Sequence, residues 1–221
     1  MEDLASTANP ADAAGAQLSP GRPRSPEVIE LAQALIQTRQ TLLPKRLCVP
    51  GPDAAQTRQI LAAAAHAPDH HELLPWRFIS VPEAARAALG DAFAAALRLR
   101  DAAATPQQME QAREKAGRAP LLLLAVARLR DADDEIAPHE RILSAGCAIQ
   151  NMLLMAHALG FGASLTSGKA LQSAPLRALF DLGEDEQALC FVNIGTPVRA
   201  KPIRARPEVE RFCSTLSLPH S

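Results

Sequence analysis

The pattern of apolar and polar positions divides the chain into helical and extended segments. Val28, Leu31 and Leu35 are spaced to lie on one face of a helix that begins after Ser25. Asp53, with Gln56 three residues later, resembles a capping box at the start of a second helix. This pattern predicts helices over about residues 26–39, 54–66, 83–100, 106–115 and 175–180.

The longest predicted helix covers residues 138–159, and Gly160 ends it. Apolar residues recur there at helical spacing, and Leu154 and Met155 extend them over nearly the whole circumference. A helix that is apolar all round is typical of a buried position. We therefore expect a central buried helix, with Cys147 as an inert, buried small side chain.

Four segments are predicted to be strands. Residues 76–81 alternate, with Trp76 expected in the core, and residues 121–127 are continuously apolar, as in a strand buried on both faces. The other two are 163–166 and 188–194. Helices and strands are interleaved without a regular βαβ order, which favours an α+β fold.

The first 25 residues differ from the rest of the chain. They are rich in Ala, Pro, Gly and Ser and show no hydrophobic period. We interpret residues 1–25 as a flexible tail, or as an arm on a partner subunit, and residues 26–221 as one domain.

Composition and charge exclude several classes of protein. Lys and Arg total 23 against 24 Asp and Glu, and aromatic residues make up 3%, which argues against a nucleic-acid binder. The four cysteines form no C-x-x-C pair, so reduced thiols in a cytoplasmic protein are expected. No secretory leader is visible, and the most apolar stretch, 121–127, is too short to span a membrane.

Two groups of residues could carry chemistry. His66, His70 and His71 lie near Asp69, but a polar loop with solvated histidines is the preferred interpretation, and no metal site is predicted. Arg39, Gln40 and Thr41 could form a phosphate pocket if the fold brings them to a C-terminal basic cluster. That cluster comprises Lys201, Arg204 and Arg206, and a solvated basic surface is the alternative.

Several blocks of the sequence, in a fixed order, resemble motifs of one family. They are Ala67-Pro68-Asp69-His70 with Pro75-Trp76-Arg77-Phe78, residues 144–154 with Gly160-Phe161-Gly162, and Gly195-Thr196-Pro197 followed by Lys201. Together they resemble the nitroreductase family of flavoproteins, most closely its minimal, YdjA-type subgroup. The resemblance extends over about residues 28–206.

The resemblance implies a nitroreductase-like fold with a mixed, mainly antiparallel sheet. It also implies a homodimer with two FMN sites at the subunit interface, each built from both chains. NADH or NADPH would be the reductant and a small molecule the electron acceptor. The positions that the resemblance assigns to FMN are Arg39, Gln40, Thr41, His66, His70, Leu165, Thr166, Ser167, Lys201 and Arg204.

The chain departs from the family pattern at several of these positions. Gln40 replaces an Arg, and Leu165 and Thr166 replace an aromatic residue and an Arg, which predicts a wider and less polar pocket over the flavin. The resemblance implies ping-pong reduction of nitroaromatics, quinones or enones, with no protein catalytic residue, because the flavin carries the hydride chemistry. The alternatives are dehalogenation or flavin fragmentation on the same fold, or a non-catalytic flavin-binding protein.

Overall fold

The computed structural model describes residues 25–130, 135–199, 202 and 205–217. The chain forms two compact units, Met1–Ala34 and Leu35–Ser221. The described part of the smaller unit is the beginning of helix α1 (Pro26–Thr38), and every other element below belongs to the larger unit.

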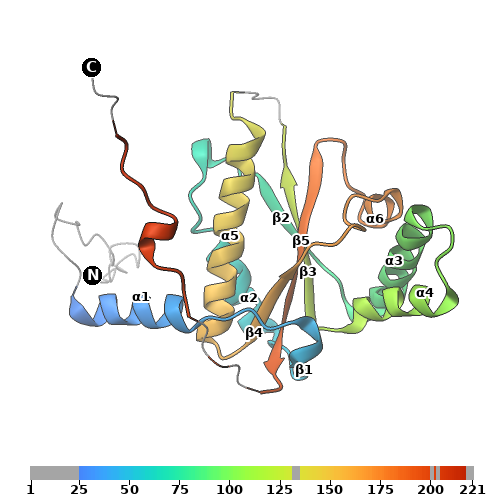
Figure 1. The fold of residues 1–221 in the computed structure, drawn as a ribbon, viewed down its shortest axis with the longest axis horizontal. Coiled ribbons are helices and arrows are strands. Elements are labelled where there is room, and N and C mark those ends of the chain that lie inside the picture. Colours follow the sequence, from blue (N-terminus) through green and yellow to red (C-terminus); the bar gives the residue numbers. More distant parts are fainter. Residues whose placement is uncertain (1–24, 131–134, 200–201, 203–204, 218–221) are drawn as a thin grey trace, which may run out of the picture. The chain divides into compact units, whose positions relative to one another are not determined.

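The larger unit is an α+β fold, as predicted (Figure 1). The predicted elements are present, with ends that differ by a few residues. The helices are α2 (Ala54–Ala64), α3 (Arg86–Arg100), α4 (Pro106–Arg113), α5 (Pro138–Ala158) and α6 (Ala174–Leu179). The strands are β1 (Leu47–Cys48), β2 (Trp76–Ser80), β3 (Leu121–Arg128), β4 (Gly162–Thr166) and β5 (Glu186–Pro197). No helix in the described part of the chain is long and apolar enough to cross a membrane.

Strand β5 organises the five-stranded sheet. It pairs antiparallel with β3 along one edge, and with β4 and then β1 along the other, while β2 pairs with β3. Asn193, for example, lies opposite Leu122 of β3 and Ser164 of β4. A single parallel bridge joins Thr41 to Ala163, so the segment after α1 runs beside β4.

Side chains of β3 alternate between two hydrophobic cores, which explains the continuous apolar run in its sequence. Leu123 and Ala125 pack with α2 and α5 on one face of the sheet, and Leu124 and Val126 pack with α3 and α6 on the other. Figure 1 shows these helix pairs on opposite sides of the sheet. Both side-chain sets are therefore removed from water, as sequence analysis predicts for this strand.

Helix α5 is buried on one face only, because it packs on one side of the sheet. Ile149 and Met152 lie in the core, whereas 67% of Leu143 is exposed and Cys147 is also exposed. The predictions of a helix buried all round and of a buried Cys147 are therefore wrong for the single chain. The sequence shows that a surface is apolar, but not whether the chain itself covers it.

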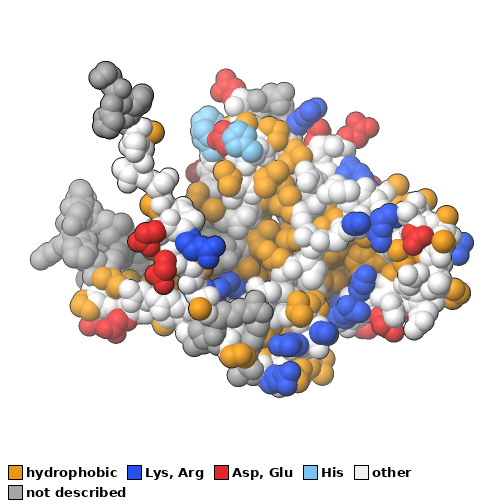
Figure 2. All heavy atoms as spheres, in the orientation of Figure 1, with side chains coloured by type: hydrophobic (Ala, Val, Ile, Leu, Met, Phe, Trp, Pro, Cys, Tyr) orange, Lys and Arg blue, Asp and Glu red, His pale blue; other side chains and the backbone are white. Residues whose placement is uncertain are grey.

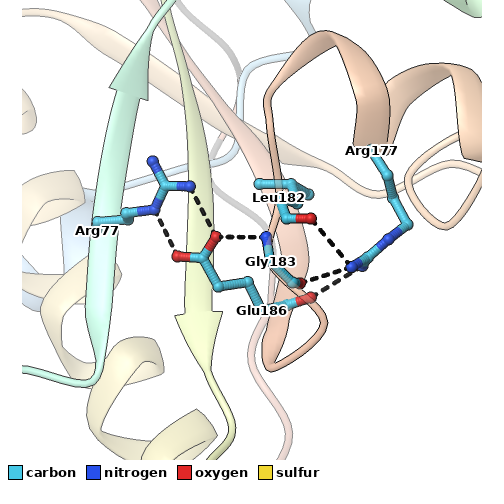
Figure 3. A network of polar contacts seen from close by, with 5 residues as sticks. All are labelled: Arg77, Arg177, Leu182, Gly183 and Glu186. Carbon is cyan, nitrogen blue, oxygen red and sulfur yellow. Dashed lines mark hydrogen bonds and ion pairs between the residues drawn. The ribbon is translucent and has the colours of Figure 1, made fainter.

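The polar contacts around Glu186 tie β2 and β5 to the turn before β5 (Figure 3). The Arg77 guanidinium donates to the Glu186 carboxylate through Nε at 2.6 Å and Nη2 at 2.7 Å, and the Gly183 amide donates to it at 3.1 Å. These hydrogen bonds from Arg77 hold the pKa of Glu186 below its ordinary value. Arg177 donates to three backbone carbonyls of the same turn, including that of Gly183.

Candidate functional site

A cavity of about 280 Å³ lies where three distant segments meet. Arg39 and Gln40 come from the segment after α1, His157 from the last turn of α5, and Arg199 from the residues after β5. Gly160, with φ of 85°, turns the chain from α5 toward β4 along the cavity wall. The arrangement brings Arg39 and Arg199, cations from opposite ends of the domain sequence, to one cavity.

Hydrogen bonds fix the segment after α1 beside the cavity. Thr38 Oγ1 lies 2.7 Å from His157 Nε2, and the Leu42 amide donates to the carbonyl of Ala163 at 3.0 Å. Arg206 reaches the same segment, and its Nη2 lies 3.5 Å from the Arg39 carbonyl oxygen. The guanidinium groups of this cluster and the imidazole of His157 give it the donor chemistry of a phosphate site.

A second cavity, of about 510 Å³, opens at the other end of β4. Thr166 lines it, and Phe93, Leu97 and Phe191 provide apolar wall. Asn193, only 3% exposed, also borders this cavity, and its Nδ2 donates to Thr166 Oγ1 at 3.1 Å. A cavity of this size, with an apolar interior and charged residues at its rim, suits a small organic molecule.

Strand β4 borders both cavities. Gly162 and Ala163 line the smaller cavity and Thr166 lines the larger. At about 3.3 Å per residue, the ends of this strand lie roughly 13 Å apart. Leu153 and Ala163 of the smaller cavity belong to the core on the α5 face of the sheet, whereas Leu122 and Phe191 of the larger cavity belong to the core on the α3 face. The two cavities therefore lie on opposite faces of the sheet, at its β4 edge.

The predicted site residues fall into separate groups in the single chain. Leu165 is 43% exposed, Ser167 is exposed, and Thr41 forms the bridge to β4. His66 lines a different hollow, between α2 and α5, and His70 Nδ1 lies 3.3 Å from Glu140 Oε2. Neither histidine borders either of the two cavities at β4. Lys201 and Arg204 lie outside the described residues.

Residues 66–72 also include the histidines that could have formed a metal cluster. Among the described residues, no group of three or more His, Cys, Asp or Glu side chains could hold a metal ion.

Three polar residues of the smaller cavity, Thr38, His157 and Arg199, were not predicted. Arg199 lies two residues after Gly195-Thr196-Pro197, and the motif itself did not single it out. His157 lies in the last turn of an apolar helix, and nothing in that pattern separates it from a histidine that faces water.

Comparison with known proteins gives the family of this fold and site. The model of the Nitroreductase family matches residues 50–196. The chain belongs to the nitroreductase family, as the sequence motifs predict.

Individual relatives agree with this assignment. The chain is 33% identical over 154 residues to "Putative NAD(P)H nitroreductase YdjA" of Escherichia coli (strain K12), covering 69% of this chain and 81% of that protein. The crystal structure of a nitroreductase-like family protein from Bacillus cereus superposes with a TM-score of 0.72 at 17% identity, covering 83% and 94% of the two chains. A variant of the FMN and NADPH-dependent nitroreductase NfnB, from sphigopyxis sp. strain HMH, gives a TM-score of 0.65 at 19% identity, covering 83% and 98%.

Proposed function

We propose that this chain is an FMN-dependent oxidoreductase that uses NADH or NADPH to reduce electron-poor acceptors such as nitroaromatics, quinones or enones. The observation that carries this proposal is the pair of cavities bordered by β4, a smaller one lined by Arg39 and Arg199 and a larger one with an apolar interior and a cationic rim. Membership of the nitroreductase family supports it, as do the names of the relatives. The four free cysteines support a reducing compartment, the cytoplasm.

The residues around the smaller cavity fit the phosphate end of FMN. Arg39 and Arg199 would hold the phosphate, because a guanidinium matches two phosphate oxygens with two parallel N–H donors. Gln40 and Thr41 would contact the ribityl chain. Lys201 or Arg204 would add a further cation to the phosphate.

The residues at the other end of β4 fit the ring end of the cofactor. Leu165, Thr166 and Ser167 would border the ring, with the apolar wall of the larger cavity beyond them. These side chains would limit the access of water to the reacting face. FMN, when bound, supplies the hydride chemistry, by taking hydride from the nicotinamide and passing it to the acceptor.

We further propose that the chain acts as a homodimer. The exposed apolar face of α5, which includes Leu143, would be covered by a second copy. His66 and His70 would then reach the FMN site of the partner, which accounts for their distance from both cavities at β4 of their own chain.

Purification of the full chain tests this proposal directly. We expect a yellow protein that NADH or NADPH bleaches anaerobically and that a quinone then recolours. A yellow protein that neither nucleotide reduces would instead support another flavin reaction on this fold. A colourless protein that does not bind added FMN would overturn the proposal.

A further inference from the structure

The larger cavity combines an apolar interior with a cationic rim. Phe93, Leu97 and Phe191 provide apolar surface inside it. Figure 2 shows Lys and Arg side chains gathered over the region between β1 and α4. The cations that line the cavity come from four separate segments and are Lys45, Arg100, Lys115, Arg118 and Lys169.

These five cations are unpaired within the described part of the chain. None of them forms an ion pair or side-chain hydrogen bond there, and no Asp or Glu lines the cavity. Arg113 on the neighbouring helix differs, because its guanidinium is bound by Asp91 at 2.9 Å and by Glu110 at 3.4 Å. Unneutralised charges of one sign around a cleft with apolar walls concentrate the field inside it and attract anions.

We propose that this cavity selects acceptors that combine a conjugated, apolar body with a carboxylate. The proposal rests on the function proposed above and names its substrate class. The apolar wall would take the ring of such an acceptor, and the rim would take its carboxylate. Arg100 and Arg118 can each offer a bidentate fork to a carboxylate, whereas Lys115 offers a single charge.

4-Nitrobenzoate is a suitable probe of this class. In the first two-electron step, its nitro group, NAD(P)H and one proton give a nitroso group, NAD(P)⁺ and water. One N–O bond breaks, its oxygen leaves as water, and the nicotinamide is oxidised. The carboxylate takes no part in these bond changes, so a loss of its binding in a variant can be measured apart from them.

The neutral methyl ester of the probe is the matched comparison. For the FMN-loaded wild-type protein at low salt, we expect kcat/KM for 4-nitrobenzoate to exceed that for methyl 4-nitrobenzoate by about tenfold, a preference that falls as salt screens the rim. In the triple variant Arg100→Gln, Lys115→Gln, Arg118→Gln, the preference should disappear. Arg98→Gln removes one positive charge from α3, the helix that carries Arg100, but outside the cavity lining, and it should keep the preference.

Equilibrium dialysis provides a readout that does not depend on turnover. The dissociation constant of 4-nitrobenzoate should rise about tenfold in the triple variant, while the FMN content and the turnover of the ester stay unchanged.

Equal kcat/KM values for acid and ester in the wild type would overturn the proposal. A second result would also overturn it. If the triple variant raised KM for NADPH but left KM for NADH and the dissociation constant of 4-nitrobenzoate unchanged, the rim would serve the phosphate of the reductant and not the carboxylate of the acceptor. In both cases the protein would still be yellow and active, whereas failure of the proposed function would leave it colourless or unreduced by either nucleotide.

Discussion

Thr38 Oγ1 and His157 Nε2 lie 2.7 Å apart although 119 residues separate them along the chain. The contact joins the end of α1 to the last turn of α5, and both residues line the smaller cavity. Arg39 follows directly, so the contact fixes the backbone from which that guanidinium extends.

This contact predicts that Thr38 and His157 act as a unit in cofactor binding. Thr38→Val and His157→Leu each remove it, and each should weaken FMN binding by about three- to tenfold, the range for one neutral hydrogen bond. The double variant should lose no more than the worse single variant, because both changes remove the same interaction. FMN fluorescence titration of the apoprotein measures these affinities. Multiplicative losses in the double variant would show that the two side chains act independently.

Arg39 is predicted to hold the FMN phosphate. Arg39→Ala should lower FMN affinity by about 10- to 100-fold, because it removes a charge-assisted hydrogen bond. Arg58→Ala, on the exposed side of α2, removes an equal charge away from the cavity and serves as the control. Unchanged affinity in Arg39→Ala would mean that the phosphate assignment is wrong.

The exposed face of α5 should form the dimer interface. Leu143→Glu introduces a charge where the side chain is 67% exposed in the single chain, so it should halve the mass measured by light scattering during gel filtration. Leu99→Glu changes a residue on α3 that is 72% exposed, and it should leave the mass unchanged. A dimer that persists in Leu143→Glu would place the interface elsewhere.

The Arg77–Glu186 pair predicts a pH-dependent contribution to stability. Because hydrogen bonds from Arg77 lower the folded-state pKa of Glu186 from 4.5, its contribution is complete above that value and is lost as pH falls through the folded pKa. Glu186→Gln should lower the free energy of unfolding by about 1 kcal/mol at pH 7, a figure that allows for the partial exposure of Arg77.

Urea unfolding at pH 7 and at pH 3 measures this difference. The gap between wild type and Glu186→Gln should narrow at the lower pH, because the wild-type carboxyl is protonated more readily in the unfolded state than in the folded state. Glu208→Gln, an exposed side chain outside the network, should differ little from wild type at either pH. A gap that stays constant with pH would contradict the charge-based explanation.

Local chemistry made much of the fold predictable. The capping box of Asp53 and Gln56 forms as predicted, and Trp76 is buried at the start of β2. Both signals depend on neighbours a few residues away, or on one large apolar side chain that must leave water.

The cavities were less predictable because they depend on long-range pairing. Arg39 and Thr166 were predicted from family motifs, but His157 became visible only once α1 and α5 were placed together. The cationic rim is a stronger example, since Lys45 and Lys169 lie far apart in sequence and neither belongs to a motif. The sequence pattern of α5 also could not predict which surface covers its apolar face, because such a face can pack against the same chain or against another chain.

The pairing of β5 with three other strands constrains the order in which the protein can fold during synthesis. Until residues 186–197 leave the ribosome, β2 and β3 are the only named strands that can form their native pairing. Strands β1 and β4 must wait for a partner that is translated after both of them. The nascent chain therefore carries unpaired strand edges for most of its synthesis, and truncation before β5 should yield an aggregating chain rather than a smaller domain.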